Sequence, residues 1–307
     1  MSISRQFETV SNPQNAEVDL SVEVALKTEG NAGQNPSEYS ISATRLLVHG
    51  KGELIKPSGS PLASISNQAI TESIIRTDDR IRVLDPETLP WRMICSLEIQ
   101  GVSGGGIGTG WFAGPKTIIT AGHCVFHPSL GGWAKEIKIA PGRYGSEFPF
   151  PKNRSITKPL ISRRFNSVKG WIEDQDTNFD FAVIHLDEPV GNETGWFSIA
   201  SEEDTHLKGL LVNVSGYPGD KEFGRFQYFA SSKIDKVMAS RFFYEADTYG
   251  GQSGGPVWFQ DDNDKPVVIG IHSYGVGGSF TLNSATRINI DVFQTLKGWI
   301  DDDQDKT

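Results

Sequence analysis

The sequence predicts an all-β fold made of two consecutive sets of short strands, and three observations support this prediction. The 307 residues include 33 glycines and 16 prolines, which suits many short strands joined by turns. Turn signals such as 217–220 and 261–264 separate short β-branched and aromatic runs. Only residues 290–300 place their apolar side chains on one helical face. Many short strands without long helices between them are typical of β-barrels or β-sandwiches.

The first 72 residues differ in composition from the rest of the chain. They are rich in Ser, Asn, Gln and Pro, and residues 35–37 and 56–61 are turn or linker signals. Such a segment is either a disordered or weakly ordered extension or a part with a separate role. Residues 1–8 contain no apolar core of a signal peptide. No apolar run in the chain approaches the roughly 18 residues of a membrane span, so we expect no membrane association.

The first set of strands is expected to form one lobe. Its predicted strands are residues 91–100, 109–113, 117–121, 136–140 and 181–186. The glycine-rich stretch 103–108 is expected to be a flexible hairpin loop. It lacks the lysine and the following helix of a phosphate cradle, which argues against nucleotide binding. His123 comes where the strand at 117–121 ends, and we expect it on a short helical turn.

The second set is expected to form a second lobe. Its predicted strands are residues 210–215, 242–246, 255–259, 267–272 and 283–287. A helix over 290–300 follows, with Val292, Leu296 and Trp299 on its apolar face. The acidic tail 301–305 is expected to be solvated rather than to bind a metal.

The overall charge and the cysteine count narrow the possible functions. The net charge is −9 and the isoelectric point is about 5.2, with no basic patch, so we expect no nucleic-acid partner. A hydrophobic fraction of 37% is enough for a sizeable core. Cys95 and Cys124 are the only cysteines. They form either one disulfide or two buried free thiols, because spacing alone does not decide between these.

The stretch 247–257 carries the strongest chemical signal. It places four glycines around Ser253, the arrangement of a tight turn whose backbone N–H groups can point at one site. Two such donors beside a nucleophilic oxygen form an oxyanion hole, and by position they would be the N–H groups of Gly251 and Ser253. The alternative is an ordinary glycine-rich hairpin turn.

Two upstream residues match the needs of a serine nucleophile. A serine hydroxyl requires a base that takes its proton, and histidine is the usual base near neutral pH. His123 follows an apolar strand, and Asp180 lies between Phe179 and Phe181 at the start of another. An unpaired carboxylate there would cost several kcal/mol, which pairing with an imidazole avoids. The residues therefore predict a catalytic triad in the order His123, Asp180, Ser253.

Several segments in this order resemble one family. They are residues 110–111, 114–117, 120–124, 216–221 and 247–257. The sequence from about Ser73 to about Ile300 resembles the glutamyl endopeptidases, a branch of the chymotrypsin-like serine proteases. This resemblance implies two six-stranded antiparallel β-barrels and a C-terminal α-helix. Residues 73–200 would form the barrel with His123 and Asp180, and residues 201–307 the barrel with Ser253.

The resemblance also implies how the protein is processed and where it acts. Residues 1–72 would be a propeptide, because Glu72 directly precedes a stretch that resembles the start of the mature enzymes. An enzyme that cuts after glutamate could then process itself. The family is exported, although no signal peptide is visible here. We expect polypeptide substrates, a monomer, no cofactor and no required metal; the spacing of acidic residues establishes no calcium site.

The resemblance assigns a substrate pocket as well. Residues 268–275 resemble the pocket wall of glutamyl endopeptidases, with His272 at the position that binds the substrate carboxylate and Ser273 and Gly275 beside it. Thr248 falls at the pocket base, and the amine of Ser73 would join after processing. The N–H of His272 and the hydroxyl of Thr248 are neutral donors, which suit a substrate carboxylate that enters an apolar slot. The alternatives are a core role for His272, a different cleavage preference with Asp247 as an acidic pocket group, or an inactive protease-fold binding protein.

Overall fold

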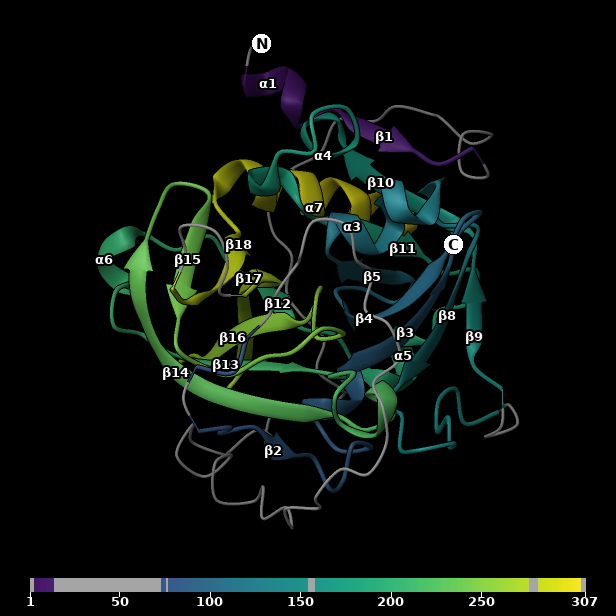
Figure 1. The fold of residues 1–307 in the computed structure, drawn as a ribbon, viewed down its shortest axis with the longest axis horizontal. Coiled ribbons are helices and arrows are strands. Elements are labelled where there is room, and N and C mark those ends of the chain that lie inside the picture. The colour runs from purple at the N-terminus through teal and green to yellow at the C-terminus, as the bar shows by residue number, and fades with distance from the viewer. Residues whose placement is uncertain (1–2, 14–72, 76, 154–157, 276–280, 305–307) are drawn as a thin grey trace.

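The structure is a computed structural model that describes residues 3–13, 73–75, 77–153, 158–275 and 281–304. Figure 1 shows two lobes side by side, with the helix α7 (Ile290–Gln304) lying across the top of both. The all-β prediction is confirmed, because the described chain is dominated by two large sheets. None of the described helices is long and apolar enough to cross a membrane.

The first lobe is one curled antiparallel sheet. Its order is β1 (Thr9–Ser11), β10 (Arg164–Val168), β11 (Ala182–His185), β5 (Thr117–Thr120), β4 (Gly105–Phe112), β3 (Ile94–Gln100), β8 (Glu136–Pro141) and β9 (Leu160–Ser162). Alternating apolar side chains such as Leu97, Ile99, Ile137 and Ile139 fill its interior. The ladders of the described strands leave the sheet open between β9 and β1, although β9 passes almost directly into β10 at Arg163.

The second lobe is a closed barrel. Its order is β12 (Ser198–Ile199), β17 (Pro266–Tyr274), β16 (Pro256–Gln260), β13 (Leu211–Gly216), β14 (Tyr228–Val237), β15 (Arg241–Tyr244) and β18 (Asn283–Arg287). A further ladder between β17 and β18 closes six of these strands into a ring. The short strand β2 (Ile81–Arg82) is added to β14, and β12 pairs with β17 in parallel.

Short helices and turns occupy the connections. In the described part of the chain the helical turns are α1 (Ile3–Gln6), α3 (Gly122–Val125), α4 (Lys169–Ile172), α5 (Gly191–Thr194) and α6 (Asp204–Leu207). Single turns of 3-10 helix cover Trp91–Met93, Pro128–Leu130, Thr177–Phe179 and Glu222–Gly224, and β6 (Phe126–His127) pairs with β7 (Gly132–Trp133). The predicted helical turn at His123 is confirmed.

Aromatic side chains join the two lobes. Trp111 of β4 contacts Phe197 edge to face with ring centroids 5.9 Å apart, and Phe197 lies 6.1 Å from Trp258 of β16. Trp258 in turn contacts Trp91, and all four rings are buried. Such pairs contribute about 0.5–1.5 kcal/mol each beyond the area they bury. This cluster fixes the lobes relative to each other and so fixes any site between them.

The glycine-rich stretch differs from its prediction. Residues 105–108 belong to β4 and pair with Glu98 and its neighbours in β3, so only residues 101–104 form the hairpin loop. A Cβ on Gly108 would lie 2.8 Å from the Cys124 Sγ. Glycine is needed there for the close approach of another element and not for a flexible turn.

The acidic tail also differs from its prediction. Helix α7 continues through residues 301–304, and the Asp303 side chain is buried against the first lobe. It accepts a hydrogen bond of 2.8 Å from the Thr117 hydroxyl and pairs with the His185 Nδ1 at 2.9 Å. The expectation of a fully solvated tail was therefore wrong for Asp303.

Both cysteines are buried and unbridged in the structure. Cys95 lies in β3, where burial raises the pKa of its thiol well above the ordinary value. Cys124 lies in α3, next to His123. Of the two alternatives left by the sequence, the structure has the free thiols.

Candidate active site

The fold brings His123 and Asp180 together at the ends of two paired strands. Strand β5 ends just before α3, which carries His123, and β11 begins just after Asp180. The Asp180 carboxylate accepts two hydrogen bonds of 2.8 Å, one from the His123 backbone N–H and one from its Nδ1. A Cβ on Gly122 would lie 2.7 Å from the Trp171 ring and 3.0 Å from the Asp180 Oδ1. Glycine at that position therefore lets the imidazole and carboxylate meet.

Burial and the short contact change both acidities. His123 and Asp180 are almost completely buried. Burial alone would lower the pKa of His123, but the adjacent Asp180 carboxylate raises it well above its ordinary value. Burial alone would raise the pKa of Asp180, but His123 lowers it, with help from a hydrogen bond of Tyr274. The aspartate is thus held as the anion that supports a protonated imidazole.

Tyr274 is a site residue that the sequence argument did not identify. Its hydroxyl interacts with the Asp180 carboxylate and lowers the pKa of that group, and its ring lies 6.1 Å from the His123 ring. Arg241 covers the other side, with its guanidinium 4.7 Å from the Tyr274 ring centroid. Arg241 is itself held by the Thr177 carbonyl at 2.7 Å and the Ser284 hydroxyl at 2.8 Å. A β-bulge between His272 and Tyr274 aims this side chain, and no local sequence pattern announces a bulge.

Ser253 lies on a turn that is packed against the strands leading to His123. Its carbonyl accepts a 2.8 Å hydrogen bond from the Thr109 N–H and a 3.7 Å contact from the Cys124 Sγ. The next residue, Gly254, has a φ of +87°, and a Cβ there would lie 2.2 Å from both the Thr109 carbonyl oxygen and the Thr120 Oγ1. Only glycine fits this backbone, so the turn and the histidine strand are locked together.

The peptide groups around Ser253 have defined directions. The Gly250 carbonyl accepts a hydrogen bond of 2.7 Å from Gly219, and the Gln252 carbonyl accepts one of 2.9 Å from Gly255. In a trans peptide the N–H points opposite to the carbonyl, so the N–H groups of Gly251 and Ser253 point away from those partners. Gly251 has a φ of +107°, which favours glycine. These are the two donors that the sequence predicts for an oxyanion hole.

The residues predicted for the pocket lie in the second lobe, on β17 and in the loops that follow β15 and β17. His272 is in the middle of β17 and is fully buried, and its Nδ1 shares a hydrogen bond of 2.5 Å with the Tyr244 hydroxyl of β15. Thr248 is also fully buried, and among the described residues its hydroxyl has no hydrogen-bond partner. The hydroxyl of Ser273 is engaged inside the barrel by the Ile271 carbonyl and Thr286, and Gly275 is buried at the end of β17.

Ser73 lies next to Thr248 and Asn283. Its N–H donates to the Asn283 Oδ1 at 3.1 Å, and its carbonyl accepts from the Asn283 Nδ2 at 2.8 Å and from the Thr248 N–H at 3.4 Å. Asn283 is fully buried in β18 and was not identified from the sequence. Asn283 and Thr248 thus hold Ser73, the predicted mature N-terminus, on the second lobe.

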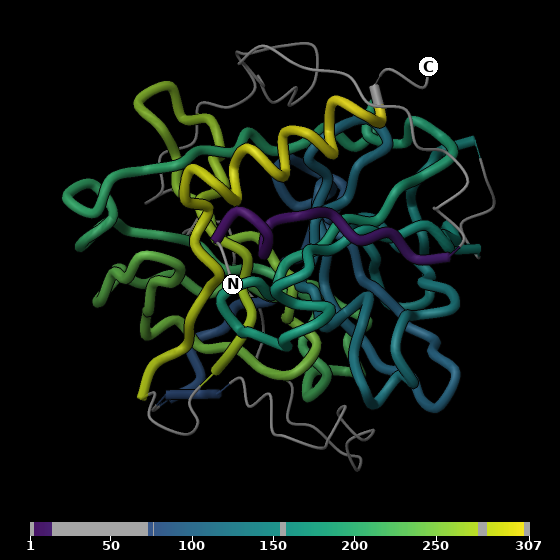
Figure 2. Tube along the Cα trace, turned by 90° about the horizontal axis from the view of Figure 1, so that it is seen from above, coloured from purple at the N-terminus to yellow at the C-terminus, as the bar shows by residue number. Residues whose placement is uncertain are grey.

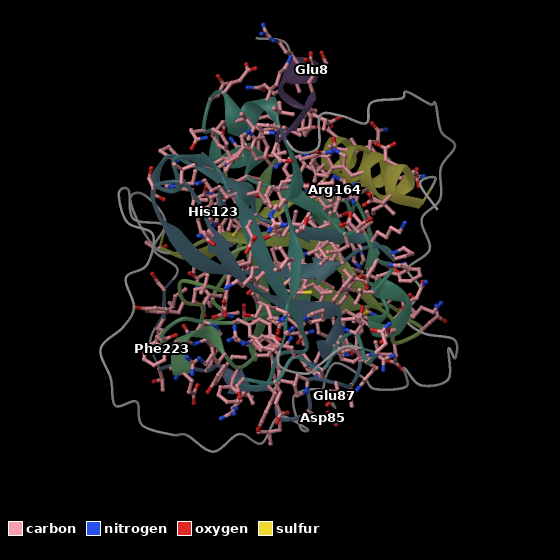
Figure 3. The ribbon with its side chains drawn as sticks, turned by 90° about the vertical axis from the view of Figure 1, so that its right-hand side faces the viewer. Glu8, Asp85, Glu87, His123, Arg164 and Phe223 are labelled. Carbon is pink, nitrogen blue, oxygen red and sulfur yellow. The ribbon has the colours of Figure 1, made fainter. Side chains whose placement is uncertain are left out.

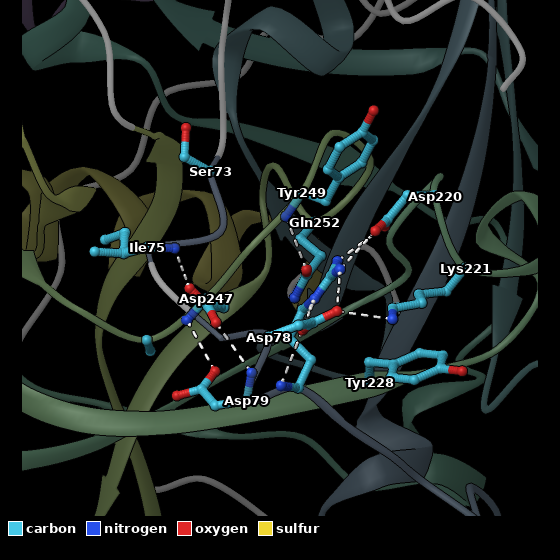
Figure 4. A network of polar contacts seen from close by, with 12 residues as sticks. Ser73, Ile75, Asp78, Asp79, Asp220, Lys221, Tyr228, Asp247, Tyr249 and Gln252 are labelled. Carbon is cyan, nitrogen blue, oxygen red and sulfur yellow. Dashed lines mark hydrogen bonds and ion pairs between the residues drawn. The ribbon is translucent and has the colours of Figure 1, made fainter. Parts of the chain in front are cut away.

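A polar network anchors the residues that follow Ser73 (Figure 4). Asp247 accepts hydrogen bonds from the backbone N–H of Ile75 at 2.5 Å and of Asp79 at 3.0 Å. The buried Arg80 guanidinium bonds Asp78 at 2.9 Å and Asp220 at 2.5 Å. Asp247 therefore anchors Ile75 and Asp79, which accounts for this carboxylate without a role as an acidic pocket group.

Comparisons with known proteins agree with this geometry. The family model described as Trypsin matches residues 85–300. A glutamyl endopeptidase of Bacillus licheniformis is 33% identical over 91% of this chain and 87% of its own. A Bacillus subtilis protein named extracellular metalloprotease is 36% identical over 74% of this chain and 69% of its own. A solved Glu endopeptidase structure has a TM-score of 0.62 at 26% identity, covering 74% of this chain and 99% of that one.

A closed β-barrel, a second curled sheet and a buried histidine–aspartate pair beside a serine turn define a serine endopeptidase. The chain belongs to the trypsin family. The predicted resemblance to this class and to glutamyl endopeptidases is confirmed.

The raised pKa of His123 predicts how kcat/KM depends on pH. His123 must be neutral to accept a proton, so activity appears as the pH rises through the pKa of His123. Because that pKa is raised, the acid limb of kcat/KM should lie above about 6.5, the ordinary histidine value. Tyr274→Phe removes a donor from Asp180, makes the carboxylate more basic and should move the limb to still higher pH. It should also lower kcat by about tenfold.

The measurement is a pH profile of kcat/KM for the wild type and the variant. Tyr228→Phe is the matched control, because its hydroxyl contacts Glu222 on the second lobe and not the triad. An acid limb at the same pH in Tyr274→Phe and the wild type would contradict this assignment.

Proposed function

We propose that this enzyme cuts peptide bonds after glutamate, with Ser253 as nucleophile, His123 as general base and Asp180 as the group that orients the base. The observation that carries the proposal is the pair of 2.8 Å hydrogen bonds that fix His123 on Asp180, next to the strands that hold the Ser253 turn. With Nδ1 donating to the carboxylate, Nε2 is the nitrogen that can accept a proton.

The reaction follows from these roles. Ser253 Oγ attacks the carbonyl carbon of the scissile bond while His123 Nε2 takes its proton. The N–H groups of Gly251 and Ser253 stabilise the oxyanion, and losing one such donor typically costs about 3 kcal/mol of transition-state stabilisation. His123 then protonates the leaving amine, and an acyl-enzyme remains. Water then attacks the acyl carbon while His123 takes one of its protons. The ester bond to Ser253 Oγ breaks, His123 returns the proton to that oxygen, and the acid leaves.

The preference for glutamate rests on the pocket. If the Tyr244 hydroxyl donates to the His272 Nδ1, the proton of the neutral imidazole lies on Nε2, where it can bind a substrate carboxylate. The Thr248 hydroxyl, without a partner among the described residues, is a second donor. The Ser73 carbonyl accepts from the Thr248 N–H at 3.4 Å, so a free amine on Ser73 would place a positive charge near Thr248. The names of the Bacillus licheniformis relative and of the solved structure support the same preference.

We further propose that the enzyme acts outside the cell after cleavage between Glu72 and Ser73. The name of the Bacillus subtilis relative supports an extracellular site of action. The anchoring of Ser73 by Asn283 and of Ile75 by Asp247 supports the start of the mature segment at Ser73. Residues 14–72 lie outside the described part of the chain.

The test is a series of peptides that differ only in the residue before the scissile bond. We expect kcat/KM for Glu to exceed that for the isosteric Gln by at least about 100-fold, because only Glu offers a charged partner to the pocket donors. Asp should be weaker than Glu, and Lys and Phe should be poor. N-terminal sequencing should find a new terminus at Ser73 in the processed wild type, whereas Ser253→Ala should remain uncut.

Two controls separate the rival functions. A metal chelator should leave activity unchanged, since every step above uses groups of the chain itself. Equal rates for Glu and Gln would assign another cleavage preference, and a processed protein that cuts none of the peptides would be a binding protein with a protease fold.

A further inference from the structure

The first described residues pack on the first lobe. Residues 3–13, here called the N-terminal segment, precede the predicted cleavage site by about sixty residues of sequence, yet they form α1 and β1 on the first lobe. Figure 2 shows this segment in purple, running beside the yellow helix α7. A propeptide that only blocks the active site would not need a segment that pairs with the sheet of the first lobe.

The segment completes the edge of the first sheet. Thr9 pairs with Val168, Val10 with Ser167 and Ser11 with Asn166 in an antiparallel ladder. Among the described strands, β10 pairs only with β11 and β1, so without β1 its outer N–H and C=O groups would form an exposed edge. Figure 3 labels Glu8 of the segment and Arg164 of β10 on this side of the molecule.

Asn12 fixes the register of this strand. It is fully buried, and its Nδ2 donates to the Arg163 carbonyl at 2.7 Å. Its Oδ1 accepts from the Phe165 N–H at 2.9 Å, and its own N–H donates to the Phe165 carbonyl at 3.0 Å. A buried amide with donors and acceptors satisfied on one partner strand specifies one alignment, because a shifted strand would leave those groups unpaired.

The segment also contacts the residues on both sides of Asp180. The Phe7 ring lies 5.0 Å from the Phe179 ring and 6.4 Å from the Phe181 ring. In strand β10, which pairs with β1, the Ser167 hydroxyl donates a hydrogen bond of 2.8 Å to the Phe181 carbonyl. The Trp299 indole of α7 donates to the Thr9 hydroxyl at 3.0 Å. The peptide that carries Asp180 is thus supported from outside by this segment.

The proposed cut breaks none of these contacts. Ser73 is anchored at Asn283 and Thr248 of the second lobe, whereas the N-terminal segment is bound to the first lobe. Within residues 3–13 the only glutamate is Glu8, whose side chain pairs with Lys169 and whose carbonyl accepts from the Lys169 N–H at 3.0 Å. The next glutamates along the chain are Glu17 and those after it, all outside the segment.

We propose that the N-terminal segment stays bound after processing as a separate short chain, and that it is a positioning element for Asp180 in the active enzyme. The active form is therefore a two-chain enzyme. The two-chain form rests on the proposed cleavage after Glu72, whereas the support of Asp180 applies to the uncut chain as well.

The first experiment measures retention. Native mass spectrometry of the processed wild type should give the mass of residues 73–307 plus a peptide that contains residues 3–13, and denaturing conditions should separate the two. Asn12→Ala should shed the peptide, whereas Arg5→Ala, an exposed position on α1, should retain it. A processed, fully active wild type that carries no such peptide would overturn the proposal.

The second experiment measures function. Processed Asn12→Ala should lose at least about tenfold in kcat with little change in KM, because a misplaced Asp180 affects proton transfer more than substrate binding. Adding a synthetic peptide of residues 1–13 should restore kcat, and the same peptide with Asn12→Ala should not. If cleavage after Glu72 does not occur, Phe7→Ala and Asn12→Ala in the uncut chain still test the support of Asp180. Unchanged kcat and an unchanged pH profile in both variants would overturn it.

Discussion

Asp180→Asn should lower kcat by about 10⁴-fold while the protein stays folded. An amide can still accept the His123 backbone N–H, but its NH₂ group cannot accept the proton of Nδ1. The imidazole then places its proton on Nε2, the nitrogen that must receive the proton of Ser253. The variant also loses the negative charge that raises the pKa of His123, so both the tautomer and the basicity become wrong.

The chain offers a matched control for this variant. His185 and Asp303 form a second buried histidine–aspartate pair, with Nδ1–carboxylate distances of 2.9 Å, between β11 and α7. Asp303→Asn changes the same chemical group in a similar environment, yet it should cost stability and leave kcat close to the wild-type value. Steady-state kinetics and thermal unfolding of both variants make the comparison, and an equal loss of kcat in the two would contradict the assignment of Asp180.

His272→Ala should separate substrate recognition from chemistry. We expect kcat/KM for a Glu peptide to fall by about 10³-fold, because the substrate carboxylate then enters an apolar pocket without its main donor. Hydrolysis of a small ester without a charged side chain should fall by less than about tenfold, since the triad is untouched. The measurement is the ratio of the two rate constants, corrected by titration of active enzyme.

A second variant guards against a general effect on the fold. His272 is fully buried in β17, so truncation leaves a cavity beside the Tyr244 ring. Tyr244→Phe keeps the ring and removes only the hydroxyl that contacts His272, and it should reduce Glu cleavage more than ester hydrolysis, by a smaller factor. Equal losses on both substrates in both variants would show that His272 serves the core of the barrel and not the pocket.

The local motifs explain why much of the site was predictable from the sequence. Ser253 lies among glycines, of which Gly251 and Gly254 have positive φ angles, and His123 and Asp180 adjoin apolar runs that pair as β5 and β11. A catalytic residue at the end of a strand can be recognised from the few residues next to it in the sequence. The strand sets were predicted for the same reason, since each is a short run bounded by turn residues.

The remaining features depend on contacts between distant residues. Tyr274 reaches Asp180 through a bulge, Tyr244 reaches His272 across the barrel, and Asn283 meets Ser73 from 210 positions away. Strand β14 was not predicted, because its stretch Ser231–Lys236 is largely polar and its pattern of burial follows from its neighbours. In the sequence the N-terminal segment looks like part of a polar extension. Its residues 9–11 form a strand because they pair with the edge of β10.

Covalent labelling tests whether Ser253 is the nucleophile of a unit formed with His123 and Asp180. The processed enzyme is treated with a serine-reactive phosphonate, digested and examined by mass spectrometry. We expect one adduct per molecule, on the peptide that contains Ser253. The labelling rate should fall in Asp180→Asn along with kcat, and Ser253→Ala should carry no adduct. An active enzyme that takes up no phosphonate, or takes it up at a different residue, would contradict the assignment of Ser253 as the nucleophile.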